Sequence, residues 1–219
     1  KEGVPVIVGN LQEKTSSVFE KRANLLLAPI HYADSYAIDF DQEFPLLGDY
    51  QKKNFKTACL ASLIIGQTGY EFDFSKWSAA LSNLNKNTGF QARLQVISAT
   101  PRVIYDVSHN EEGIQHTLDF LKSEMKEGKL HIVYGSSADK DFDTIFPLFI
   151  KTDVYYFTEF TNERSTKKAV LEEHAQKNDL NYTSFEKAQV AMEAAQLAAN
   201  PSDTILAFGS FFLLHDFLK

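Results

Sequence analysis

The second half of the chain alternates short apolar segments with amphipathic ones, and this alternation restricts the possible folds more than any other feature of the sequence. The segments LHIVYG (130–135), DVYYFT (153–158) and TILAFGS (204–210) have the composition of buried strands. Between them lie stretches of about 10 to 15 residues in which apolar side chains recur with helical spacing. Strands and helices that alternate in this way form a mostly parallel sheet covered by helices. We therefore predict an α/β fold.

The same pattern gives approximate bounds for the elements that follow residue 91. The predicted strands are RLQVIS and RVIYD, joined by a turn at 99–101, and then 130–135, 153–158 and 204–210. The predicted helices span 110–128, 142–150, 163–177, 184–199 and 211–219. Pro147 predicts a kink or an early stop in the second of these helices, and Thr183 or Ser184 is expected to cap the fourth.

The first part of the chain has a less regular pattern. Residues 4–9 predict a strand, and helical spacing covers 13–28, 51–65 and 75–84. The segment 31–44 is expected to be loop with short strand pieces, and the polar stretch 83–89, which ends in glycine, to be a linker. Cys59 is expected at a buried position on a helix. As the only cysteine it excludes a disulfide within the chain, which fits a reducing compartment.

The composition excludes several classes of function. The 219 residues carry a formal net charge of −7, so a general basic footprint for nucleic acid is lacking. No apolar run approaches the ~20 residues needed to cross a bilayer. We therefore expect a cytoplasmic protein with neither nucleic acid nor membrane as a partner. The chain opens KEGVPVIVGN and enters a strand directly, so we also expect it to be part of a longer protein.

Polar residues follow three of the predicted strands. They are the runs Asp106 to Asn110 and Ser136 to Asp141, and the pair Gly209-Ser210. Because the carboxyl ends of parallel strands meet at one edge of a sheet, we expect the three groups to share an edge where a ligand could bind. The alternative is that Asp, Asn, Ser and Gly stand there because they make turns and cap helices.

Single residues suggest roles that the pattern alone leaves open. His109 directly precedes a predicted helix, where the helix dipole disfavours imidazolium, so it is either a neutral ligand contact or a structural histidine. Arg93 could hold a phosphate in a bidentate manner or form a surface ion pair. Asn54 lies one helical turn after Tyr50, and its amide could contact an adenine edge. The other histidines have no Cys or His partners at metal-ligand spacing, so no metal site is predicted in this chain.

The motifs in this chain, taken together, resemble the dihydrofolate synthase–folylpolyglutamate synthase family. The matching phrases are KEGVPVIVGN, LLGDYQKKN, ARLQVIS…PRVIYDVSHNEEG, GSSADKD and AFGSFFL. This family belongs to a wider group of ATP-dependent amide ligases that includes the muramyl-peptide ligases. Where the family usually has Asp-x-Ala-His-Asn-Pro, this chain has Ser108 and Glu111 in place of Ala and Pro. Both residues suit a helix start.

The resemblance implies two domains. Residues 1–91 would be the C-terminal part of a central α/β ATPase domain of the P-loop type, and 92–219 a complete Rossmann-like glutamate-ligase domain. The sequence contains no G-x-x-x-x-G-K-[ST] phosphate loop, nor a G-x-S-x-G or G-x-G-x-x-G motif. We therefore expect the phosphate loop and the magnesium ligands in a preceding part, and we expect this chain to be inactive by itself.

The resemblance also implies an activity and its site residues. The family uses ATP and Mg²⁺ to add L-glutamate to dihydropteroate, or to the γ-carboxyl of folylpolyglutamates, through an acyl phosphate, and the full-length enzyme is expected to be a monomer. Asn54 would contact adenine, Arg93 the phosphates and Asp106 the ribose, whereas His109, Lys140 and Ser210 would lie on the glutamate side. Two alternatives remain: the C-terminal domain of a muramyl-peptide ligase, and a non-catalytic module that binds a nucleotide or an amino acid.

Overall fold

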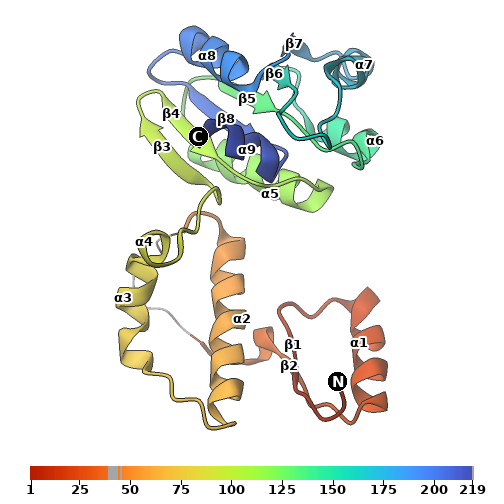
Figure 1. Cartoon of the computed structure of the whole chain (residues 1–219), viewed down its shortest axis with the longest axis vertical. Coiled ribbons are helices and arrows are strands. Elements are labelled where there is room, and N and C mark those ends of the chain that lie inside the picture. Colours follow the sequence, from red (N-terminus) through yellow and green to blue (C-terminus); the bar gives the residue numbers. More distant parts are fainter. Residues whose placement is uncertain (39–43, 45, 219) are drawn as a thin grey trace. The chain divides into compact units, whose positions relative to one another are not determined.

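The chain divides into two compact units, Lys1–Phe90 and Gln91–Lys219. The structure, a computed structural model, describes residues 1–38, 44 and 46–218, and Figure 1 shows the elements of each unit. None of the helices within these described ranges is long and apolar enough to cross a membrane.

The first unit contains a small parallel sheet and several helices. Strand β1 (Val6–Val8) pairs with β2 (Ile30–Tyr32), and helix α1 (Glu13–Leu25) connects them. The 3-10 turn η1 (Ala33–Ser35), helix α2 (Asp49–Gly66), the 3-10 turn η2 (Phe74–Lys76) and helix α3 (Trp77–Ser82) follow. Residues 39–43 of the predicted loop 31–44 lie outside the described residues.

The predicted linker 83–89 lies directly before the boundary between the two units, but it is not a loop, because helix α4 (Leu84–Thr88) occupies most of it. Gly89 ends this helix in the left-handed conformation, with φ of 66°, so the glycine that suggested a linker is a helix C-cap. The prediction for Cys59 is confirmed. Its thiol is buried on α2, and burial raises its pKa to about 11.

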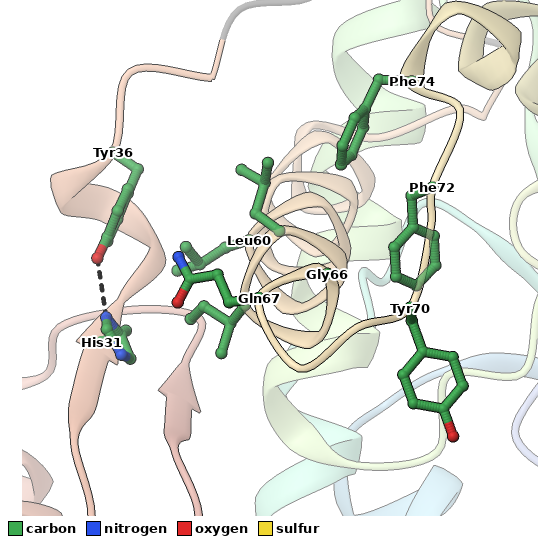
Figure 2. Close-up of a pocket in the computed structure, with 10 residues that line it drawn as sticks. His31, Tyr36, Leu60, Gly66, Gln67, Tyr70, Phe72 and Phe74 are labelled. Carbon is green, nitrogen blue, oxygen red and sulfur yellow. Dashed lines mark hydrogen bonds between the residues drawn. The ribbon is translucent and has the colours of Figure 1, made fainter.

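A hollow of about 540 Å³ lies in the first unit beside α2. Figure 2 shows His31 and Tyr36 joined by a hydrogen bond of 2.8 Å between Nδ1 and the phenol oxygen, with Leu60 and Gln67 close by. Phe72 and Phe74 contribute aromatic surface to the same hollow.

The second unit is built on one six-stranded sheet with the order β3-β4-β8-β5-β6-β7. The strands are β3 (Gln95–Ala99), β4 (Arg102–Tyr105), β5 (Leu130–Tyr134), β6 (Val154–Thr158), β7 (Asn181–Phe185) and β8 (Thr204–Phe208). Every pairing is parallel except that of β3 with β4. The predicted α/β fold with a mostly parallel sheet is therefore confirmed.

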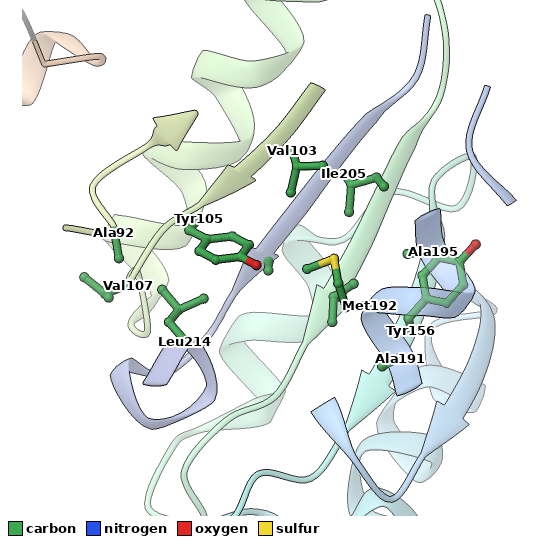
Figure 3. Close-up of a cluster of buried hydrophobic side chains, with 12 residues drawn as sticks. Ala92, Val103, Tyr105, Val107, Tyr156, Ala191, Met192, Ala195, Ile205 and Leu214 are labelled. Carbon is green, nitrogen blue, oxygen red and sulfur yellow. The ribbon is translucent and has the colours of Figure 1, made fainter. Parts of the chain in front are cut away.

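Helices cover both faces of this sheet. Helices α8 (Ala188–Ala198) and α9 (Phe211–Phe217) pack on one face, where Met192 and Leu214 meet Val103, Tyr105 and Ile205 (Figure 3). The alternate side chains of the strands point to the other face, as the period of two requires. There Tyr134 packs at ring-centroid distances of 5.2 to 6.3 Å against Phe146, Phe149 and Phe157.

The elements on that other face follow from the sequence with one correction. Helix α5 (Glu111–Glu124), helix α6 (Phe142–Ile145), the 3-10 turn η3 (Phe146–Leu148) and helix α7 (Lys168–Lys177) lie in the predicted places. Pro147 stops α6 early, as predicted. The predicted helix 163–177, however, begins only at Lys168, because the residues before it pair with the loop after β5 through an isolated bridge, Ser137 to Ser165.

Strand β7 corrects the start of the predicted helix 184–199. Thr183 and Ser184 are strand residues rather than caps, and α8 begins at Ala188. The segment NYTSF contains two aromatic residues and one β-branched residue, which favour a strand over a helix, and β7 lies at the edge of the sheet. The sequence pattern missed it because both of its faces are only partly buried.

A buried polar cluster joins the amino ends of β5 and β8. His131 accepts a hydrogen bond at Nδ1 from the hydroxyl of Tyr156 at 3.0 Å and donates from Nε2 to the carboxylate of Asp203 at 3.3 Å. Burial raises the pKa of Asp203, but hydrogen bonds from the backbone of Asn200 and Lys129 outweigh burial and bring it to about 2.

Candidate ligand-binding edge of the second unit

Strands β4, β8 and β5 are parallel neighbours, and their carboxyl ends form one edge of the sheet. Tyr105 pairs with Ala207, and Tyr134 pairs with Phe208, so the three strands end at nearly the same level. The prediction that the three polar groups share an edge is therefore confirmed. In an open α/β sheet this is the edge at which ligands bind.

Asp106 follows β4 and is almost completely buried, with 1% of its surface exposed. Its Oδ1 accepts hydrogen bonds from the amide of Ser108 at 2.8 Å and the hydroxyl of Thr117 at 3.1 Å. Its Oδ2 accepts one from the amide of Leu94 at 2.9 Å. The carboxylate therefore has protein donors at both oxygens, and its contact with a ribose remains a prediction.

Arg93 lies on a turn with unusual backbone geometry. The residues on either side, Ala92 and Leu94, are not glycines but have φ of 60° and 49°. Both are buried, whereas Arg93 is exposed and its guanidinium makes no ion pair or hydrogen bond within the described residues. A left-handed conformation costs a residue with a Cβ about 1–2 kcal/mol, so the surrounding contacts must hold this turn in place.

His109 lies at the start of α5 with a defined tautomer. Its Nδ1 is 2.8 Å from the carbonyl oxygen of Val107, which can only accept, so Nδ1 carries the proton. In the neutral ring Nε2 is then an acceptor on an exposed side chain. Asn110 caps the helix by accepting from the amide of Gly113 at 2.9 Å. A Cβ at Gly113 would lie 2.8 Å from the Asn110 side-chain oxygen, so a larger residue there would displace this oxygen from its present position.

Two cations converge on Asp139 in the loop after β5. Lys140 Nζ and an Arg164 guanidinium nitrogen each lie 3.5 Å from Asp139 Oδ2. The pKa of Asp139 lies below its usual value: burial raises it, but a backbone hydrogen bond and the two cations outweigh burial. Arg164 lies in the loop before α7, and a hydrogen bond joins this loop to the β5 loop, since the amide of Ala138 donates to the Arg164 carbonyl at 2.9 Å.

Ser210 follows β8 and caps α9. Its hydroxyl oxygen accepts from the amide of Phe212 at 3.2 Å, which agrees with the structural alternative for this residue. The preceding Gly209 has φ of 115°, and a Cβ there would lie 2.6 Å from the carbonyl oxygen of Gly135. Only glycine fits between β5 and β8 at this point of the edge.

Three buried hydroxyls at or near this edge lack hydrogen-bond partners in the described part of the chain. They belong to Ser108, Ser136 and Thr166. Buried polar groups are normally paired, so unpaired ones at a ligand edge indicate donors that are satisfied by a ligand or by water. The sequence did not single out Thr166, and no local pattern marks it, because its position depends on the long-range bond from its amide to the Ser136 carbonyl.

Asn54 belongs to the first unit, unlike the other five predicted site residues. It is exposed on α2, and its side-chain nitrogen donates to Gln51 Oε1 at 3.4 Å. In the second unit the structure brings Arg93 and Asp106 together through Leu94, and it places His109, Lys140 and Ser210 at the ends of adjacent strands. Among the described residues no group of three or more His, Cys, Asp or Glu side chains could hold a metal ion.

The mostly parallel sheet, its two helical layers and the polar carboxyl edge define a Rossmann-like α/β domain, a class of protein in which ligands usually bind at that edge. The family model described as "Mur ligase, glutamate ligase domain" matches residues 92–211. Because that match covers more than half of the 219 residues, the chain belongs to the Mur ligase family.

The relatives include folate enzymes and a muramyl-peptide ligase, the UDP-N-acetylmuramoyl-L-alanyl-D-glutamate--L-lysine ligase of Enterococcus faecalis, which is 24% identical over 81% of this chain and 35% of its own length. The folylpolyglutamate synthase of Lacticaseibacillus casei is 26% identical over 65% of this chain and 37% of its own length. The dihydrofolate synthase/folylpolyglutamate synthase of Escherichia coli is 33% identical over 54% of this chain and 28% of its own length. The solved structure of E. coli FolC in complex with DHPP and ADP has the same fold, with a TM-score of 0.80 and 23% identity. All of this chain matches 53% of that chain, so the chain spans about half the length of this relative.

Proposed function

We propose that this chain forms part of an ATP-dependent ligase that adds L-glutamate to dihydropteroate, to the γ-carboxyl of folylpolyglutamates, or to both. The proposal includes Mg²⁺ as the cofactor and the cytoplasm as the site of the reaction. The observation that carries it is the edge of the second unit, where Arg93, His109 and Lys140 lie on loops at one end of the sheet. Its support from relatives is the similarity to folylpolyglutamate and dihydrofolate synthases.

The chemistry of the edge suits this reaction. A carboxylate is a poor electrophile until one oxygen becomes part of a phosphate leaving group, and charge then develops on the transferred phosphoryl group. Arg93 is a cation without a protein partner in the described ranges, so its guanidinium is available to this charge. Asn54 on the first unit would contact adenine, and Asp106 would contribute to the nucleotide side.

The opposite side of the edge suits an amino acid with two carboxylates. Lys140 and Arg164 supply two positive charges around the single carboxylate of Asp139. His109 offers an exposed Nε2, and Ser210 a hydroxyl whose proton has no acceptor in the described part of the chain. These groups would hold glutamate so that its amine reaches the activated carboxyl. Mg²⁺ supplies charge neutralisation at the phosphates when bound, and we expect its ligands in a preceding part of the protein.

The experiment is an amide-ligation assay on the whole protein that contains this chain. ATP and glutamate are supplied with dihydropteroate, with a folylpolyglutamate, or with a nucleotide-linked muramyl acid. ADP release that depends on dihydropteroate or folate supports the proposal. Release that depends only on the muramyl acid would assign the muramyl-peptide ligase alternative, and binding of ATP or glutamate without ligation would assign the non-catalytic module.

We also propose that the 219-residue chain does not catalyse the reaction by itself. Its sequence contains no G-x-x-x-x-G-K-[ST] phosphate loop to hold the β- and γ-phosphates. Folate-dependent ADP release by the isolated chain would contradict this statement while leaving the assignment of the whole protein untouched.

A further inference from the structure

We propose that Asp106 is a positioning residue that fixes the turn carrying Arg93, and that Thr117 fixes Asp106. The turn comprises residues Gln91–Gln95 and is called the Arg93 turn below. The inference rests on the proposed function in one respect, the phosphate contact of Arg93. It adds a role for the Asp106 carboxylate, and one for Thr117, a residue outside the motifs.

The backbone of the Arg93 turn is strained. Ala92 and Leu94 hold φ of 60° and 49° although each has a Cβ. Two left-handed residues with one residue between them turn the backbone so that both flanking side chains point into the core, at 2% and 1% exposure, and Arg93 points out. An isolated peptide would leave this conformation, so the rest of the unit must impose it.

Three hydrogen bonds impose this backbone conformation on the Arg93 turn. The amide of Val107 donates to the Ala92 carbonyl at 3.0 Å, and the amide of Ala92 donates to Gln95 Oε1 at 2.8 Å. The third bond runs from the amide of Leu94 to Asp106 Oδ2 at 2.9 Å. Only the third bond has a carboxylate acceptor, and charge-assisted bonds are about twice as strong as neutral ones. Asp106 is therefore the main anchor at the residue next to Arg93.

The Asp106 carboxylate is itself held in one orientation. Asp106 Oδ1 accepts from the amide of Ser108 at 2.8 Å and from the hydroxyl of Thr117 at 3.1 Å. Thr117 lies on α5 with 1% exposure, so its hydroxyl is fixed by the helix. Two bonds to one oxygen prevent rotation of the carboxylate and direct Oδ2 at Leu94. Thr117 therefore acts on Arg93 through Asp106.

The direct test is hydrogen exchange at the amide of Leu94 in the 219-residue chain, followed by NMR. In Asp106→Asn, one orientation of the new side chain places its NH₂ group against a backbone donor, and the other gives the amide of Leu94 a neutral acceptor in place of the charged one. In both cases hydrogen exchange at the amide of Leu94 should be about tenfold faster or more. Thr117→Val removes one donor with little change of shape and should give a smaller increase, and Thr117→Ser should restore protection. Asp119→Asn is the matched control, since it removes the same charge from an exposed position on α5.

Circular dichroism and the protection of amides in β5 report whether Asp106→Asn remains folded. If it does not, Thr117→Val against Thr117→Ser carries the test. Leu94 protection that is unchanged in the folded Asp106→Asn variant, or in Thr117→Val when Asp106→Asn does not fold, overturns the inference.

A second readout separates this role from a ribose contact. Calorimetry measures binding of ADP and of inorganic tripolyphosphate, which has no ribose. Asp106→Asn and Arg93→Gln should each weaken tripolyphosphate binding by about tenfold, and the double variant should be no weaker than either, because both changes remove the same interaction. A loss confined to ADP would show a ribose contact and overturn the positioning role. The calorimetry is done on the whole protein that contains this chain. If Arg93→Gln leaves tripolyphosphate binding unchanged there and Leu94 exchange still responds as expected, the phosphate role of Arg93 fails and the anchor stands.

Discussion

The two units of this chain differ in how completely each buries its apolar side chains. The second unit has a six-stranded sheet with helices on both faces, and its strands β5 and β8 are buried at every position. The first unit has a two-stranded sheet and a core cluster made of Ala33, Leu60 and Ile64. Large apolar side chains remain exposed around it, such as Leu25 at 72%, Leu27 at 77% and Tyr70 at 68%. An α/β sheet covered on both faces supplies its own core, whereas a two-stranded sheet does not.

The largest expected effect tests this difference in the cores. Ile132→Ala removes a fully buried side chain at the centre of the sheet and should lower the free energy of unfolding by about 2–5 kcal/mol. Leu27→Ala in the first unit should change it by less than about 0.5 kcal/mol. Urea titrations that are monitored by hydrogen exchange in each unit measure the free energy of unfolding of both variants. Equal losses would mean that the first unit contributes to a shared core.

The next effect compares two glycines with positive φ. Gly209→Ala places a Cβ 2.6 Å from a backbone oxygen in the second unit and should cost at least about 1–3 kcal/mol. Gly69→Ala in the first unit has φ of 98° but no atom within 4 Å of the added carbon, so only the cost of the conformation remains. Thermal unfolding of the two variants should show the larger shift for Gly209→Ala, and the reverse order would contradict the packing at that edge.

The acid stability of the second unit should depend on Asp203. Its pKa falls from 3.8 to about 2 on folding, so the folded state binds fewer protons there than the unfolded state. This contribution is present above pH 4 and is lost as the pH falls towards 2. Asp203→Asn should lower stability at pH 7 and flatten the profile between pH 4 and 2. Asp179→Asn, an exposed member of a surface ion pair, should leave the profile nearly unchanged.

The smallest effect concerns affinity rather than folding. In the whole protein, Arg164→Gln should raise the KM for glutamate about tenfold, because a charged hydrogen-bond donor to a carboxylate is lost, and should leave stability within about 0.5 kcal/mol. Lys151→Gln removes an exposed cation that pairs with Asp179 and should leave the KM unchanged. Steady-state kinetics at varied glutamate provide the measurement, and an unchanged KM in Arg164→Gln removes this residue from the site.

The sequence predicted the parts of the fold whose signal is local. Apolar runs gave β4, β5, β6 and β8, and the capping residue Asn110 and Pro147 marked the start of one helix and the end of another. Strand β7 was missed because its pattern is weak and its stability comes from pairing with β6. The helix in the stretch 83–89 was not predicted, because a glycine at the end of a polar stretch marks helix ends as well as linkers.

The candidate site shows the same difference between features with a local sequence signal and features that depend on long-range contacts. The shared edge followed from strand order, since parallel neighbours end together. The Arg93 turn could not be predicted, because Ala92 and Leu94 ordinarily avoid positive φ. Two of the three bonds that hold them there come from Asp106 and Val107, which are 12 and 15 positions away from Leu94 and Ala92. Arg164 could not be assigned to the site from the sequence for a similar reason. Its place beside Asp139 depends on a bridge between two loops that are far apart in the sequence.

The boundary between the two units falls between Phe90 and Gln91, directly before the Arg93 turn. The described bonds that shape this turn come from the second unit, through Gln95, Asp106 and Val107. The direction of Arg93 is therefore decoupled from the connection that precedes it. Arg93 therefore belongs to the second unit as a fixed part of the sheet edge, and the described bonds that set its direction include none from the backbone before Gln91.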